Sequence, residues 1–169
     1  SNLNEISRTA IINVKEKSNS DITGLYNSFS SEFKDSITLE KFEQIFDAPV
    51  YLENDAALAG LGEAVRGAGV GFRIIAYITI GTGVGGARIV SRQIDTSALG
   101  FEPGHQIINY TKGVAETLEQ FVSGTAIEEH YQKKPFELDD VAAWDEIARQ
   151  LSVGLINTIV HWSPDIVIL

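Results

Sequence analysis

Two periodicities alternate along the chain. Runs rich in β-branched residues predict strands, and apolar positions three or four apart predict helices. The predicted strands cover 9–14, 50–53, 73–80, 87–90, 105–110 and 165–169. The predicted helices cover 22–33, 39–46, 55–66, 117–131 (interrupted at Gly124) and 141–159. Because strands alternate with helices, we assign the chain to the α/β class.

Capping and breaking residues mark the ends of the last predicted helix. Asp139 or Asp140 is expected to cap helix 141–159 at its N-terminus, and Pro164 ends it. Further back, residues 91–104 contain several helix and strand breakers, so we expect this stretch to be mostly loop.

Composition narrows the class of protein. The 169 residues are 44% hydrophobic and 21% charged, which is typical of a globular domain or of a piece of a larger one. Lys plus Arg number 13 and Asp plus Glu number 23, so the formal net charge is −10. Such an acidic chain repels phosphate backbones, and we expect no nucleic-acid interface within these residues.

The absence of cysteine and of long apolar runs excludes further classes. With no cysteine, the chain can form neither disulfides nor cysteine zinc sites, and it has no thiolate nucleophile. No uninterrupted apolar run has membrane-spanning length and no secretory signal is visible, so we expect a cytoplasmic protein that does not associate with membranes.

The densest motif is the glycine-rich turn at 81–86, between two predicted strands. Gly81, Gly83 and Gly86 fit the dinucleotide pattern G-x-G-x-x-G, but that motif requires a helix directly afterwards and a strand is predicted here. No Lys-Ser or Lys-Thr pair follows, which excludes a Walker loop. Two interpretations stay open, a hairpin turn without ligand and a backbone cradle for phosphate.

Polar residues follow the strand 50–53. Asn54 and Asp55 lie at its carboxyl end, the sheet edge where α/β proteins bind ligands. A carboxylate there can accept the proton of a substrate hydroxyl during phosphoryl transfer. The alternative is that Asn54 or Asp55 caps the helix that follows.

Two further segments carry candidate ligands for a small polar molecule. Glu102 and His105 flank a rigid Pro-Gly pair in a predicted loop, and an exposed turn is the alternative interpretation. Glu119 begins a helix, where it either complements the helix dipole or contacts a sugar hydroxyl. Zinc is a poor interpretation of His105, because His130 and His161 lie on separate predicted helices.

Taken together and in order, these motifs resemble the ROK family of bacterial sugar kinases and sugar-responsive repressors. The matching segments are PVYLENDAALAGLGE (49–63), ITIGTGVGGARIV (78–90), GFEPGH (100–105), LEQFVSGTAI (118–127) and SPDIVIL (163–169). The resemblance implies an actin/hexokinase-like, ribonuclease H-like ATPase fold, of which the chain holds a part. It further implies residues 1–48 as a remnant of the N-terminal lobe and 49–169 as the core with the start of the C-terminal lobe.

The resemblance assigns roles to the sugar site. Asp55 matches the catalytic base that takes the proton from the attacking sugar hydroxyl. Asn54 matches a sugar-binding residue, Glu102 and His105 match the family's acid and histidine that bind sugar hydroxyls, and Glu119 matches a further sugar-contacting glutamate.

The resemblance also implies a nucleotide site. Gly81, Thr82 and Gly83 match the second phosphate-binding loop, which holds the phosphates of ATP, and Mg²⁺ would be carried by the nucleotide. The cysteine-rich zinc motif of most ROK proteins is replaced here by residues 109–115, so we expect no metal site. The first phosphate loop, Asp-x-Gly-Gly-Thr, has no counterpart in 1–48, so we expect the chain to be incomplete.

The resemblance predicts phosphorylation of a hexose or N-acetylhexosamine by ATP, in a protein that forms a homodimer. The alternative is a sugar-sensing domain of a ROK-type repressor, which binds sugar without turnover. Asp55 favours the kinase, because a pure sensor has no need of a base.

Overall fold

The computed structural model describes residues 8–12, 43–44, 46–48, 50–96 and 101–169. The chain divides into two compact units, Ser1–Asp55 and Ala56–Leu169, and each is described by itself.

The described part of the first unit contains a two-stranded antiparallel ribbon. Strand β1 (Arg8–Ile12) pairs with β2 (Val50–Asn54), and the register runs from Arg8 opposite Asn54 to Ile12 opposite Val50. Strands were predicted at 9–14 and 50–53, and residues 13 and 14 of the first lie outside the described residues. The predicted helix 22–33 lies outside the described residues, and of 39–46 only residues 43, 44 and 46 are described, all helical.

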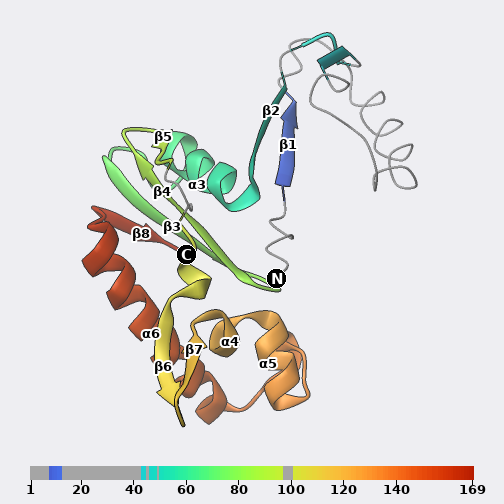
Figure 1. The fold of residues 1–169 in the computed structure, drawn as a ribbon, viewed down its shortest axis with the longest axis vertical. Coiled ribbons are helices and arrows are strands. Elements are labelled where there is room, and N and C mark those ends of the chain that lie inside the picture. The colour runs from blue at the N-terminus through green and yellow to red at the C-terminus, as the bar shows by residue number, and fades with distance from the viewer. Residues whose placement is uncertain (1–7, 13–42, 45, 49, 97–100) are drawn as a thin grey trace. The chain divides into compact units, whose positions relative to one another are not determined.

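The second unit begins with helix α3 (Asp55–Arg66, whose first residue belongs to the first unit) and a four-stranded sheet (Figure 1). The strands are β3 (Ile74–Ile80), β4 (Val84–Val90), β5 (Gln93–Ile94) and β8 (Ile166–Ile168), in the order β5-β4-β3-β8. Only the β3–β8 pair is parallel. Small residues let α3 approach the sheet closely, since a Cβ at Gly60 would lie 2.9 Å from the Cβ of Tyr77.

The rest of the unit is built mainly from helices. After the 3-10 turn η1 (Pro103–His105) come the hairpin β6 (Ile107–Thr111) and β7 (Val114–Thr117), then α4 (Glu119–Val122), α5 (Gly124–Tyr131), the turn η2 (Pro135–Glu137) and α6 (Val141–Trp162). Helix α6 contacts α4, β6 and β3 (Figure 1). A hydrophobic core joins β3 and β4 to these helices; its buried members are Ile78, Val84, Leu118, Val122, Ile127, Leu138, Ala143 and Ile147.

The structure corrects the predicted extent of the glycine turn. Strand β4 begins at Val84, so the turn is confined to 81–83. Gly85 and Gly86 pair with Thr79 and Ile78 of β3. The fourth glycine is required by packing, because a Cβ at Gly86 would lie 2.6 Å from the carbonyl oxygen of Tyr77.

The segments after β4 agree with the expectations in part. The stretch 91–104 was expected to be mostly loop, and its described residues are loop apart from the two-residue strand β5 and the start of η1. Strand β7 was not predicted. The helix expected over 117–131 with an interruption at Gly124 is two helices, which begin at Glu119 and break at Ser123. The hydroxyl Oγ of Ser123 accepts a hydrogen bond from the Ala126 N–H and caps α5.

The last helix fulfils its prediction. The Oδ1 atom of Asp140 accepts a hydrogen bond of 2.9 Å from the Ala142 N–H, which identifies Asp140 as the N-cap of α6. Among the helices that the structure describes, none is long and apolar enough to cross a membrane.

Candidate functional site

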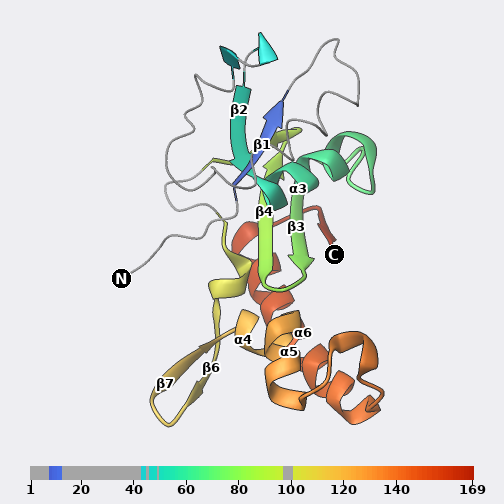
Figure 2. The same cartoon turned by 90° about the vertical axis from the view of Figure 1, so that its right-hand side faces the viewer.

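The tip of the β3–β4 hairpin is held at the start of α5. The Gly81 N–H donates to the Gly83 carbonyl within the turn (2.9 Å). The N–H groups of Gly124 and Thr125 donate to the carbonyls of Gly81 (2.7 Å) and Thr82 (3.3 Å). The closed end of the hairpin therefore lies against α4 and α5 (Figure 2). The predicted strand-turn-strand is confirmed, and the turn has an anchor that the sequence did not indicate.

Glu119 bridges the base of this tip. Its Oε2 atom accepts a hydrogen bond of 2.6 Å from the Val84 N–H, 35 positions earlier in the chain. A Cβ built on Gly83 would lie 2.7 Å from the same oxygen, and one on Gly104 would lie 3.3 Å from it. Glycines at these two positions thus make room for the carboxylate. The structure brings together three of the predicted segments here: the glycine turn, the EPGH segment and the start of α4.

Glu102 and His105 lie at the two ends of η1 rather than in an irregular loop. The His105 N–H donates to the Glu102 carbonyl (3.1 Å), and both side chains are exposed while Pro103 and Gly104 between them are buried. A Cβ on Gly104 would overlap the carbonyl oxygen of Val84, so η1 packs directly against β4. Packing of the η1 backbone against β4 thus fixes η1, while the side chains of Glu102 and His105 are exposed to solvent.

Two cavities meet at the hairpin tip. The first, which we call the polar cavity, has a volume of about 550 Å³. It is lined by Thr82, Glu119, Gln120, Ser123, Thr125, Ala126, Glu129 and His130. Hydroxyls, amides and carboxylates of this kind suit a ligand rich in hydroxyl groups.

The second, which we call the apolar cavity, has a volume of about 670 Å³. Its walls come from the hairpin tip, α5, the η2 segment and one face of α6. They comprise Ile80, Gly81, Thr82, Val122, Gly124, Thr125, Ile127, Glu128, Lys134, Pro135, Phe136, Trp144, Ile147, Ala148 and Leu151. Thr82 and Thr125 line both cavities, so the tip separates a polar space from an apolar one.

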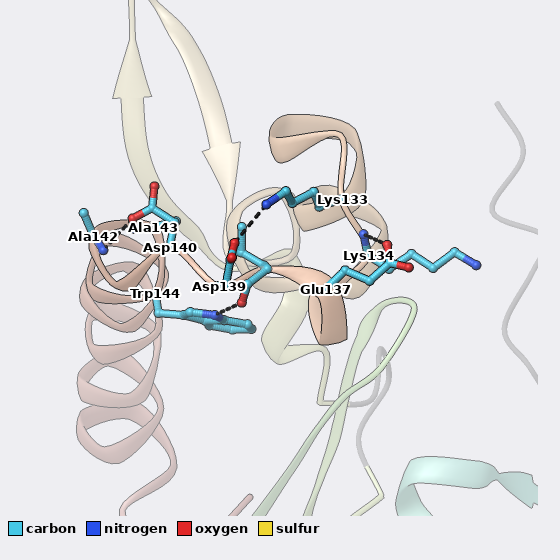
Figure 3. Close-up of polar contacts among 9 residues, drawn as sticks. Lys133, Lys134, Glu137, Asp139, Asp140, Ala142, Ala143 and Trp144 are labelled. Carbon is cyan, nitrogen blue, oxygen red and sulfur yellow. Dashed lines mark hydrogen bonds and ion pairs between the residues drawn. The ribbon is translucent and has the colours of Figure 1, made fainter.

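Polar contacts shape the η2 wall of the apolar cavity (Figure 3). The Trp144 Nε1–H donates to the Leu138 carbonyl (2.8 Å), which fixes the indole at the start of α6. Lys133 pairs with Asp139 (2.9 Å). The hydrogen bond from Lys133 lowers the pKa of Asp139 and, reciprocally, Asp139 raises the pKa of Lys133. Asp139 therefore serves this ion pair and not the α6 cap.

A third cavity, of about 380 Å³, has Glu102 in its wall. Its other lining residues are Phe101, Pro103, Gln106, Ile107, Asn157, Thr158, His161 and Trp162. The rings of Phe101 and Trp162 meet edge to face with centroids 4.9 Å apart. Glu102 and Glu119 thus line different cavities.

Asn54 and Asp55 belong to the first unit. Asn54 ends β2, and its N–H donates to Glu53 Oε1 (2.9 Å); Asp55 is the first residue of α3. The predicted strand end and helix start are confirmed. An acidic residue in the first turn of a helix complements the helix dipole, and Asp55 has this position in α3.

No cluster of three or more His, Cys, Asp or Glu side chains fit to hold a metal ion occurs in the part of the chain that the structure describes. His130 and His161 are both exposed, and each lines a cavity.

Sequence reasoning missed the aromatic and polar walls of these cavities. Trp144 reads as one of the apolar positions of α6, and Lys134 and Phe136 lie in a segment without a motif. The one available signal was the S-G-T run at 123–125, where a helix N-terminus follows a serine.

Comparison with known proteins now decides the family. A sequence model described as "ROK family" matches residues 5–169. The chain belongs to the ROK family. Solved ROK structures share its fold: the ROK hexokinase of Thermus thermophilus is 26% identical with a TM-score of 0.65, over 76% of this chain and 51% of that one. The α/β class and the actin/hexokinase-like fold are thereby confirmed.

Both kinases and repressors occur among these ROK relatives. A glucokinase from Streptomyces griseus, solved with glucose and AMPPNP, is 26% identical with a TM-score of 0.58, over 76% of this chain and 54% of that one. A putative xylose repressor from Caldicellulosiruptor is 25% identical over 75% of this chain and 41% of its own length. This ROK chain spans about half the length of the curated relatives it matches.

Proposed function

We propose that the protein transfers the γ-phosphoryl group of ATP to a hydroxyl of a hexose or an N-acetylhexosamine. The observation that carries this proposal is the position of Thr82 in the walls of both the polar and the apolar cavity. A kinase needs a polar space for its acceptor, an apolar space for a nucleotide base, and a phosphate-binding turn at their junction.

The residues around the tip suit a nucleotide. The apolar cavity offers the indole of Trp144 for a base and the ammonium group of Lys134 for negative charge. At the tip, Gly81 has open space where a Cβ would lie, so phosphate oxygens can approach the backbone. Bound ATP supplies the phosphoryl group, and the Mg²⁺ that accompanies it neutralises charge on the phosphate oxygens.

The polar side chains suit a sugar. Glu119 lines the polar cavity beside the tip, and Glu102 lines the third cavity. By resemblance to the family, Glu102, His105 and Asn54 each bind sugar hydroxyls. Asp55 takes the proton of the reacting hydroxyl. The hydroxyl oxygen then bonds to the γ-phosphorus as the bond from phosphorus to the bridging oxygen breaks, which releases ADP. In this proposal 1–48 belong to the N-terminal lobe and 49–169 to the core.

The test is a coupled ADP-release assay on the full-length protein with glucose, mannose, fructose, N-acetylglucosamine and N-acetylmannosamine. We expect release with at least one sugar, and a loss of about 10²–10⁴-fold in kcat for Asp55→Asn because the general base is removed. Calorimetry should show that Asp55→Asn still binds the sugar. Absence of ADP release with every sugar, or wild-type turnover in Asp55→Asn, would overturn the proposal.

The match to a putative xylose repressor favours one alternative, a sugar-sensing domain without turnover. The same two measurements separate the candidates. A wild-type protein that binds a sugar in calorimetry but releases no ADP with it is a sensor, and one that does both is a kinase.

A further inference from the structure

Among the described residues, Glu119 is a side chain of the polar cavity that hydrogen-bonds to the backbone where the glycine turn 81–83 enters β4. Its Oε2 atom accepts the Val84 N–H at 2.6 Å, and it does so from the first residue of α4. The built Cβ of Gly83 lies 2.7 Å from Oε2 but 3.9 Å from Oε1. The two carboxylate oxygens therefore differ, because Oε2 faces the turn and Oε1 lies farther from it.

Among the described residues, the other backbone hydrogen bonds of the turn lie within it or run to the start of α5. Its carbonyls at Gly81 and Thr82 accept from the start of α5, and the Val84 N–H is the amide at which the turn enters β4. A hydrogen bond from this amide to a carboxylate is charge-assisted and stronger than a neutral one. The rotamer of Glu119 thus influences where the Gly83–Val84 peptide lies.

We propose that Glu119 is a positioning residue that couples sugar binding to the conformation of the phosphate-binding turn. This rests on the proposed function, in which a sugar hydroxyl binds the Glu119 carboxylate. A hydroxyl that donates to the carboxylate from the cavity side fixes its rotamer. The same rotamer then holds the Val84 N–H, so the turn is ordered before the nucleotide arrives. By linkage, bound nucleotide must tighten sugar binding by the same factor.

The first test measures this coupling by calorimetry on the full-length protein. The ligands are AMPPNP and, among the five sugars named above, the one that the wild type binds most tightly. The coupling factor is the Kd of AMPPNP without sugar divided by its Kd with saturating sugar. We expect at least about fivefold for the wild type and a factor near one for Glu119→Ala. Glu119→Gln keeps an acceptor oxygen in place and should give a factor above that of Glu119→Ala.

Glu129→Gln is the matched control. Glu129 is a second carboxylate in the wall of the polar cavity, and it should keep the wild-type coupling factor. If Glu119 had a purely structural role, Glu119→Ala would weaken AMPPNP binding equally with and without sugar, and the coupling factor would stay unchanged. The coupling factor is therefore the measurement that separates the two roles.

The second test perturbs the carboxylate from the side of the turn. Gly83→Ala places a methyl group 2.7 Å from Oε2 and must displace Glu119, whereas Gly81→Ala meets nothing within 4 Å. With no nucleotide present, we expect Gly83→Ala to weaken sugar binding roughly tenfold, the effect of one misplaced charged hydrogen bond, and Gly81→Ala to leave it unchanged.

The outcomes separate the two proposals. If the wild type binds both ligands with a coupling factor of one, or if Glu119→Ala keeps the wild-type factor, this inference is wrong and the kinase proposal stands. If Gly83→Ala and Gly81→Ala have equal sugar affinities, the contact between turn and carboxylate has no role in sugar binding and the inference is again wrong. If the wild type binds no sugar, both proposals fail.

Discussion

The guanidinium Nε of Arg88 donates a hydrogen bond of 2.9 Å to the carbonyl oxygen of Trp162, 74 positions later in the chain. Trp162 is the last residue of α6, so the cation of Arg88 lies where the helix dipole is negative. The same guanidinium pairs with Asp95, and the Arg88 side chain is 22% exposed. One side chain of β4 thus links the hairpin to the C-terminal end of α6.

We expect Arg88→Met to destabilise the protein by about 1–3 kcal/mol, because it removes a partly buried charged hydrogen bond and leaves Asp95 without its cation. Urea denaturation of the full-length protein measures this change. Arg149→Met is the control, since Arg149 pairs with Glu146 on the surface of α6 and is 70% exposed. Its loss should cost less than about 0.5 kcal/mol. Equal losses for the two variants would contradict the role of Arg88.

Two helical glycines should respond oppositely to alanine. Gly154 of α6 is buried, and a Cβ there would lie 2.5 Å from Cδ2 of Leu118, which is fully buried. We expect Gly154→Ala to destabilise by about 1–3 kcal/mol through overpacking. Gly62 of α3 has nothing within 4 Å of its Cβ position, so Gly62→Ala should stabilise by roughly 0.5–1 kcal/mol. Thermal and urea unfolding of both variants give the signs, and a stabilised Gly154→Ala would show that Leu118 can move aside.

Glu102→Gln and His105→Ala should each weaken sugar binding. A lost hydrogen bond to a charged group corresponds to about 1.5–3 kcal/mol, or roughly 10–150-fold in Kd, measured by calorimetry with the sugar that the screen identifies. The control is Glu146→Gln, which alters an exposed carboxylate of α6 whose pKa is lowered by hydrogen bonds from Gln150 and Arg149. Unchanged sugar affinity in both variants would show that the side chains of η1 and its flanking Glu102 do not bind the sugar.

Trp144→Ala should weaken AMPPNP binding by roughly 2–10-fold and leave sugar affinity unchanged, because the indole faces the apolar cavity and supplies a stacking surface of about 0.5–1.5 kcal/mol. Trp144→Phe keeps an aromatic ring and should retain most of the affinity. Trp162→Ala is the matched control, since Trp162 lines the third cavity, which also has Glu102 in its wall. Equal AMPPNP affinity for the wild type and Trp144→Ala would show that the nucleotide base does not stack on Trp144.

Local patterns in the sequence determined most of the elements. Alternating and β-branched positions predicted β2, β3 and β8, and the apolar stripe with a cap at Asp140 predicted α6, because these signals act between residues a few positions apart. The strands it missed are β5, with two residues, and β7, with four, and neither holds an unbroken β-branched run like the Ile-Val-Ile of β8. The motifs in their order also predicted the ROK family, which the comparisons confirm.

Tertiary structure alone decided how the motifs meet. No local pattern relates Glu119 to the Val84 N–H or puts Trp144 and Thr82 in the walls of one cavity, because these relationships depend on how α4 and α6 pack against the hairpin. The glycines illustrate the difference. The sequence indicated a turn at 81–86, but only the packed structure shows that Gly83 makes room for a carboxylate and Gly86 for the backbone of β3. The spacing of apolar side chains depends only on the geometry of one helix or strand, so the sequence reveals it. A site forms where several elements meet, and their packing around a shared core decides which side chains meet there.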